Sequence, residues 1–66
     1  MPDFTSREKD ILRLLIEGKT NTEIGSELYI SFHTVKAILE NIYNKIGCKN
    51  RMQAAVFVIK NNIKLD

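Results

Sequence analysis

Cysteine, histidine and proline each occur only once in this sequence of 66 residues, and tryptophan is absent. The single cysteine, Cys48, cannot form an internal disulfide, and with His33 as the one histidine there is no Cys/His set with the spacing of a zinc site. No apolar run approaches the roughly 18 residues of a membrane-spanning helix. We therefore expect a cytoplasmic domain without metal, cofactor, small-molecule ligand or membrane attachment.

The chain is too short for more than one core. Its 66 residues weigh 7.6 kDa, and a chain of this size buries only about 60% of its unfolded surface. Because it contains no repeat, low-complexity stretch or linker, we expect residues 1–66 to form one domain. A deep catalytic cleft would need more chain, and no pair of titratable side chains is placed for catalysis. The sequence thus favours a binding protein over an enzyme.

Charge is distributed unevenly along the chain, although the net charge is only +2. Residues 1–33 carry four Lys/Arg and six Asp/Glu, whereas residues 34–66 carry six and two. Such asymmetry between halves is typical of proteins that bind a polyanion. A solvated helix surface would give the same pattern, and charge alone leaves both interpretations open.

Helix-start signals divide the chain into four helices. Thr5–Glu8 and Thr20–Glu23 have the form of capping boxes, Ser31 can cap a third helix, and Asn50 with Gln53 would complete a further box. The expected helices run from Thr5 to about Glu17, from Thr20 to near Tyr29, from Phe32 to Ile46, and from Asn50 to about Asn61. The sequence therefore predicts an all-α fold.

The second and third predicted helices have the arrangement of a helix-turn-helix. A turn of about three residues, 29–31, separates them, and Gly25 would let them cross closely beside Val35. The third helix buries a regular apolar stripe and carries a polar arc on its other side. That arc consists of His33, Lys36, Ala37, Glu40, Asn41 and Asn44. It is either a DNA-reading surface or a solvated face, and periodicity does not decide between the two.

Several side chains in this half of the chain suit DNA. Asn41 can bond an adenine bidentately, Glu40 can accept from a cytosine amine, and Ala37 can lie against a thymine methyl. The cationic candidates for phosphate contacts are Lys36, Lys45, Lys49 and Arg51. His33 could also touch a phosphate, or be an exposed histidine without a role.

The fourth predicted helix has two apolar lines. Ala54, Ala55 and Val58 would face the other helices, while a second line consists of Met52, Val56 and Ile59. A small domain rarely exposes such a line without a partner. We expect it to bind either a second copy of the chain or, in the alternative interpretation of the protein as a helical adaptor, another protein.

Six segments carry a resemblance to a known family. They are Thr5-Ser6-Arg7-Glu8, Thr20 to Gly25, Leu28 with Ile30-Ser31, Thr34-Val35-Lys36, Asn41 to Gly47, and Arg51 to Ala55. At these mutual spacings the chain resembles the LuxR-type helix-turn-helix domain over about residues 4 to 60. Such domains occur at the C-terminus of NarL/FixJ-type response regulators and alone in small GerE-like regulators.

The resemblance implies an all-α four-helix bundle that binds promoter DNA as a homodimer and regulates transcription, with RNA polymerase as a candidate partner. Its third helix would enter the major groove and its fourth would form the dimer contact. The family's DNA contacts would fall on Thr34, Lys36, Ala37, Glu40 and Asn41, with Lys45 and Lys49 nearby. The chain departs from the family at Ile38, at the acidic Glu40, and at Gly25, where alanine is usual and glycine should cost the helix up to about 1 kcal/mol.

Overall fold

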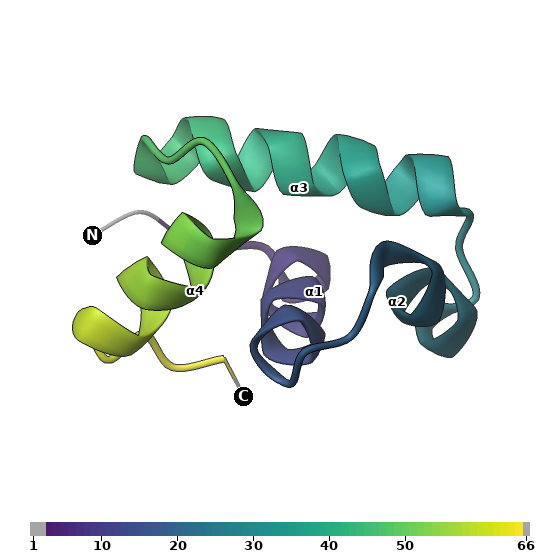
Figure 1. Cartoon of the computed structure of the whole chain (residues 1–66), viewed down its shortest axis with the longest axis horizontal. Helices are drawn as coiled ribbons and strands as arrows, with labels where there is room; N and C mark the ends of the chain where they lie inside the picture. Colours follow the sequence, from purple (N-terminus) through teal and green to yellow (C-terminus); the bar gives the residue numbers. More distant parts are fainter. Residues whose placement is uncertain (1–2, 66) are drawn as a thin grey trace.

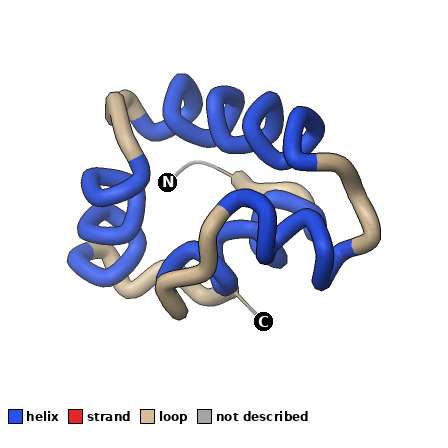
Figure 2. The backbone as a smooth tube through the Cα atoms, turned by 45° about the vertical axis from the view of Figure 1, so that its right-hand side comes forward, coloured by secondary structure: helices blue, strands red, loops and turns tan. Residues whose placement is uncertain are grey.

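The computed structural model describes residues 3–65, which form four helices and, within that range, no strand (Figures 1 and 2). The helices are α1 (Ser6–Ile16), α2 (Asn21–Leu28), α3 (Phe32–Ile46) and α4 (Arg51–Lys60). Figure 1 shows α3 along one side of the molecule, with α4, α1 and α2 beside one another beneath it. The predicted all-α fold is confirmed. No helix among the described residues is long and apolar enough to span a membrane.

Local capping fixes where the helices begin. The Thr5 hydroxyl accepts from the Glu8 amide at 3.1 Å while the Glu8 carboxylate accepts from the Thr5 amide at 2.9 Å, and Thr20 and Glu23 repeat this box at 3.1 and 2.8 Å. Each box satisfies two amides that the helix leaves unpaired. Both predicted capping boxes are therefore confirmed.

The start of α4 differs from its prediction. The Asn50 side chain accepts from the Gln53 amide at 2.9 Å, as expected, but the Gln53 side chain accepts from the Lys49 amide at 2.8 Å instead of closing the box on Asn50. Asn50 has φ −154°, a more extended backbone than Thr5 at −70°. We attribute the difference to this extension, which leaves the preceding amide within reach of Gln53.

The core lies where the four helices meet. Its buried side chains come from α1 (Ile11, Leu12, Leu15), α2 (Ile24), α3 (Val35, Leu39, Ile42) and α4 (Ala54, Val58). The apolar stripe expected for α3 is buried, and α4 contributes only the small or medium side chains Ala54 and Val58. Because α3 packs on each of the other helices, its orientation is fixed along its whole length.

Gly25 sets the distance between α2 and α3. A Cβ atom built on it would lie 2.6 Å from the Ile30 carbonyl oxygen and 3.5 Å from a Val35 methyl group. The Gly25 carbonyl in turn accepts from the amides of Tyr29 and Ile30. The close crossing expected from the sequence is confirmed, and it leaves no room for the usual alanine without movement of the turn.

Candidate nucleic-acid interface

The polar arc of α3 forms a continuous exposed face. All six of its residues are exposed: His33, Lys36, Ala37, Glu40, Asn41 and Asn44. The buried stripe of Val35, Leu39 and Ile42 holds this face outward, because those three side chains are at most 2% exposed. With a small side chain at Ala37, the helix backbone can approach a flat or grooved partner closely.

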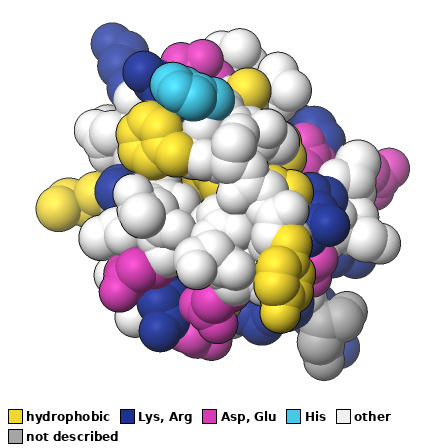
Figure 3. All heavy atoms as spheres, turned by 90° about the vertical axis from the view of Figure 1, so that its right-hand side faces the viewer, with side chains coloured by type: hydrophobic (Ala, Val, Ile, Leu, Met, Phe, Trp, Pro, Cys, Tyr) yellow, Lys and Arg dark blue, Asp and Glu magenta, His cyan; other side chains and the backbone are white. Residues whose placement is uncertain are grey.

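The N-terminus of α3 presents hydroxyl and imidazole groups beside one another. The Ser31 hydroxyl caps the helix by accepting from the Thr34 amide at 3.1 Å, and it lies 2.9 Å from the Thr34 hydroxyl. The His33 ring meets the Phe32 ring edge-on, with 5.6 Å between centroids. Figure 3, which faces the end carrying the α2–α3 turn, shows the one histidine at the upper edge beside hydrophobic and basic side chains. This end can therefore offer donors to an anionic partner.

Among the described residues, two of the four candidates for phosphate contacts, Lys36 and Lys49, have ammonium groups that are free to bind a partner. The ammonium groups of Lys36 and Lys49 form no hydrogen bond or salt bridge with any residue in the described range 3–65. Both residues are exposed. Lys36 lies in the N-terminal half of α3 and Lys49 on the connection after the helix, so the two could contact different phosphates.

Lys45 instead makes internal contacts. Its ammonium group donates to the Glu8 carboxylate at 2.6 Å and to the Asp3 carbonyl at 2.9 Å, and it lies 5.5 Å from the centre of the Phe4 ring. Burial would raise the pKa of Glu8, but the hydrogen bonds from Lys45 and from the Thr5 amide outweigh it, so the pKa lies below its ordinary value. Lys45 thus ties α3 to the start of α1, and a phosphate contact from it would have to compete with these partners.

Arg51 is also engaged inside the molecule. Its guanidinium group donates to the Asn21 side-chain oxygen at 2.9 Å and to the Lys19 carbonyl. Both acceptors lie at the start of α2, some 30 residues earlier in the chain. Sequence spacing contains no signal for either contact, because capping patterns report only local neighbours. A phosphate contact from Arg51 would likewise have to replace these partners.

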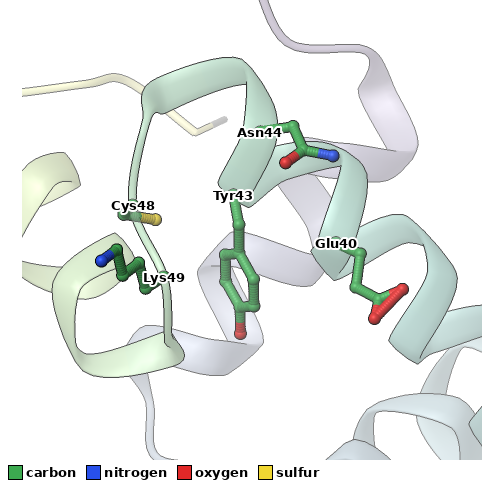
Figure 4. Close-up of a pocket in the computed structure, with 5 residues that line it drawn as sticks. All are labelled: Glu40, Tyr43, Asn44, Cys48 and Lys49. Carbon is green, nitrogen blue, oxygen red and sulfur yellow. The ribbon is translucent and has the colours of Figure 1, made fainter.

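A shallow hollow of about 430 Å³ lies beside the C-terminal half of the polar arc (Figure 4). Its lining comprises Glu40, Tyr43 and Asn44 from α3, with Cys48 and Lys49 from the connection to α4. Burial raises the pKa of both the Tyr43 phenol and the Cys48 thiol. The Cys48 thiol is half-buried and stays protonated at neutral pH, so it is a weak nucleophile.

The second apolar line of α4 is exposed. Met52, Val56 and Ile59 have exposed fractions of 74%, 55% and 63%. Ala54 and Val58, on the other side of the helix, are at most 3% exposed. The two-sided pattern expected for α4 is therefore what the structure shows. Its outer line forms an apolar surface that no described part of the chain covers.

The described residues contain no cluster that suggests metal chemistry. No group of three or more His, Cys, Asp or Glu side chains within residues 3–65 is arranged to hold an ion. The exposed α3 face carries hydroxyl, amide and ammonium groups that can donate and accept hydrogen bonds. Such groups suit recognition of a polar macromolecule.

Comparison with known proteins gives a family match across most of the chain. Residues 2–58 match the model of the bacterial regulatory proteins of the luxR family. The chain is 49% identical over 60 residues to the transcriptional regulatory protein LiaR of Bacillus subtilis (strain 168), a match that covers 91% of this chain and 28% of LiaR. It is 46% identical over 58 residues to the transcriptional regulatory protein DegU of Brevibacillus brevis, covering 88% of this chain and 25% of DegU.

A shorter relative is matched over most of its length. The spore germination protein GerE of Bacillus subtilis (strain 168) is 42% identical over 59 residues, which are 89% of this chain and 80% of GerE. The chain thus spans little more than a quarter of LiaR but four fifths of GerE.

Proposed function

The chain belongs to the luxR family of bacterial regulatory proteins, and on that premise we propose that it binds double-stranded promoter DNA and regulates transcription in the cytoplasm. In this proposal residues 1–66 act as one DNA-binding domain, α3 enters the major groove and α4 pairs two copies. The family is one of DNA-binding transcription regulators, not of enzymes. The observation that carries the proposal is the exposed polar face of α3, held outward by a buried stripe and a close α2–α3 crossing.

Base recognition is assigned to the middle of α3. A major groove about 12 Å wide admits one helix, and the side chains that point away from the core then meet base edges. Asn41 and Glu40 offer the amide and carboxylate for adenine and cytosine, and Ala37 permits close approach or contact with a thymine methyl. Asn44, one turn beyond Glu40, extends the same line. Since Glu40 is repelled by phosphates, it favours a site with a cytosine at its position.

Phosphate contacts are assigned to groups at the rim of that face. The hydroxyl of Thr34 and the ring of His33 lie at the helix N-terminus, where partial positive charge favours an anion. Lys36 and Lys49 add two ammonium groups with no partner in the described range. Contacts to the phosphates position the protein along the duplex, whereas contacts to the bases provide sequence preference.

Pairing is assigned to the apolar line of Met52, Val56 and Ile59 on α4. Two copies related by a two-fold axis would place their reading helices in successive major grooves, about 34 Å apart. The operator would then be an inverted or near-inverted repeat. A contact of so few side chains is small beside a standard interface of about 800 Å² per partner, so dimers should form mainly on DNA. RNA polymerase is a candidate partner of the bound dimer.

The test measures how binding depends on salt. Lys36→Ala should weaken binding to all sequences alike and reduce the slope of log affinity against log salt by about 0.9 for a half-site, the value of one phosphate contact. Lys64→Ala is the matched control, because it removes the same charge from the segment after α4, on the side of the molecule away from α3 (Figure 1). We expect this control to leave the slope nearly unchanged.

Equal effects of the two substitutions would contradict a specific contact at Lys36 and indicate a response to net charge alone. Absence of salt-dependent duplex binding by the unaltered chain would contradict the proposed function itself. It would favour the helical adaptor, in which the exposed α4 line binds another protein.

A further inference from the structure

Arg51 is the one described residue of α4 whose side chain forms a hydrogen bond with the region where α2 begins. It is the first residue of α4, and its guanidinium group donates to the Lys19 carbonyl and, at 2.9 Å, to the Asn21 side chain. Among the described elements α2 and α4 do not pack on one another directly; each packs on α1 and α3. Arg51 therefore bridges two helices that are otherwise connected only through α1 and α3.

The packing of α4 on α1 and α3 uses small side chains. The inward face of α4 consists of Ala54, Ala55 and Val58. Because these side chains are small, they form only low ridges for packing into the grooves of neighbouring helices. The planar guanidinium group, in contrast, has donors in fixed directions, so two acceptors at once define its orientation. The angle of α4 relative to the helix-turn-helix is thus restrained at its first residue by directional hydrogen bonds, in addition to its packing on α1 and α3.

We propose that Arg51 is a positioning residue that fixes the angle between the pairing surface of α4 and the reading helix α3, and thereby sets the half-site separation that a dimer accepts. This inference rests on the proposed function, since it assumes pairing through α4. It assigns to Arg51 a role in specificity without contact to DNA.

The size of the effect follows from the dimensions of the molecule. Its longest extent is 28 Å, and α3 with 15 residues is about 22 Å long at 1.5 Å per residue. A rotation of about 10° acting over about 20 Å moves the reading helix by about 3.5 Å, which matches the rise of about 3.4 Å between successive base pairs. A loss of angular restraint of this size at Arg51 therefore lets the dimer accept separations that differ by about one base pair.

The experiment compares half-site duplexes with full sites whose half-site separation is varied one base pair at a time. The unaltered chain should prefer one separation by about fivefold or more, the usual size of a coupling between two sites. Arg51→Met keeps the aliphatic stem and removes the donors. It should leave half-site affinity within about twofold and reduce the preference for one separation to about twofold or less.

A second pair of variants tests the same bridge from its other end. Asn21→Ala removes one acceptor at the start of α2, whereas Asn21→Asp keeps an acceptor there. The alanine variant should lose part of the separation preference and the aspartate variant should keep it. The preference is a ratio of affinities for duplexes of similar charge. The added carboxylate changes each affinity by a similar factor, so its effect cancels from the ratio. This pair remains informative if Arg51→Met fails to fold.

The outcomes separate this inference from the proposed function. A separation preference that survives in both Arg51→Met and Asn21→Ala overturns the positioning role alone. A fall in half-site affinity and salt slope equal to that of Lys36→Ala overturns it too, because Arg51 would then be a phosphate contact. If the unaltered chain binds half-sites but prefers no separation, pairing through α4 and this inference both fail while DNA binding stands.

Discussion

Replacing Gly25 by alanine sets two effects of known direction against each other. In a helix interior alanine is more favourable than glycine by about 0.8–1.0 kcal/mol, and the family pattern with alanine at this position predicts a gain in stability. The added methyl group, however, would lie 2.6 Å from the Ile30 carbonyl oxygen, whereas real Cβ contacts are essentially never shorter than 3.0 Å. The neighbour is backbone in a tight turn, so α2 and α3 must separate to make room.

Whether the substitution stabilises or destabilises the protein depends on how much this separation costs. Overpacking of a tight site costs about 1–3 kcal/mol, and the turn has little freedom because Gly25 also accepts the amides of Tyr29 and Ile30. Tyr29 is already in the left-handed region at φ 59°, which is unfavourable for a bulky side chain. We expect a net destabilisation of about 1 kcal/mol, or a Tm lower by about 4–8 °C for a domain of this size.

Urea denaturation followed by helical circular dichroism measures the change, with Ser26→Ala as the matched control. Ser26 is exposed on the same helix, one residue further on, so its replacement reports helix propensity alone and should stabilise slightly. DNA affinity provides a second measurement, since α3 shifts with the turn. If Gly25→Ala is as stable as the unaltered chain or more so, the close crossing adapts at no cost and the reasoning from its geometry is wrong.

Three further substitutions test the remaining assignments. Glu40→Ala should relax base preference at one or two operator positions by about 1–3 kcal/mol, and sequences selected from a random pool that match those of the unaltered chain would assign specificity elsewhere. Val56→Asp should leave the circular dichroism intact while lowering full-site affinity toward the half-site value; undiminished cooperative binding would place pairing on another surface. The lowered pKa of Glu8 means that its pair with Lys45 stabilises the fold above the ordinary value of 4.5, and that this stabilisation is lost as the pH falls through the lowered pKa. Urea midpoints at neutral pH and near pH 3 should therefore differ less in Glu8→Gln than in the unaltered chain, and equal differences would show that the pair contributes nothing.

The sequence was sufficient to place the helices and their faces. Capping residues act on amides within four residues, so Thr5, Thr20 and Ser31 indicated the helix starts, and Gly47 marked the end of α3. The 100° periodicity separated buried from exposed side chains on α3 because one stripe packs against all its neighbours. The family resemblance rested on the same local segments, and the match over residues 2–58 confirms it.

Contacts between residues far apart in the chain were decided only by the tertiary structure. Lysine and arginine have the same charge whether they face a phosphate or a carbonyl of the protein, so the sequence grouped Lys45 and Arg51 with Lys36. The fold brings Glu8 within 2.6 Å of Lys45 and Asn21 within 2.9 Å of Arg51, across 37 and 30 residues, and so gives both cations partners within the protein. The sequence predicted the close crossing at Gly25, but only the structure shows that the Ile30 carbonyl oxygen occupies the space where a Cβ atom would lie. Periodicity and capping depend on residues that are close in the sequence, whereas the pairing of charges and close packing depend on which helices meet in space.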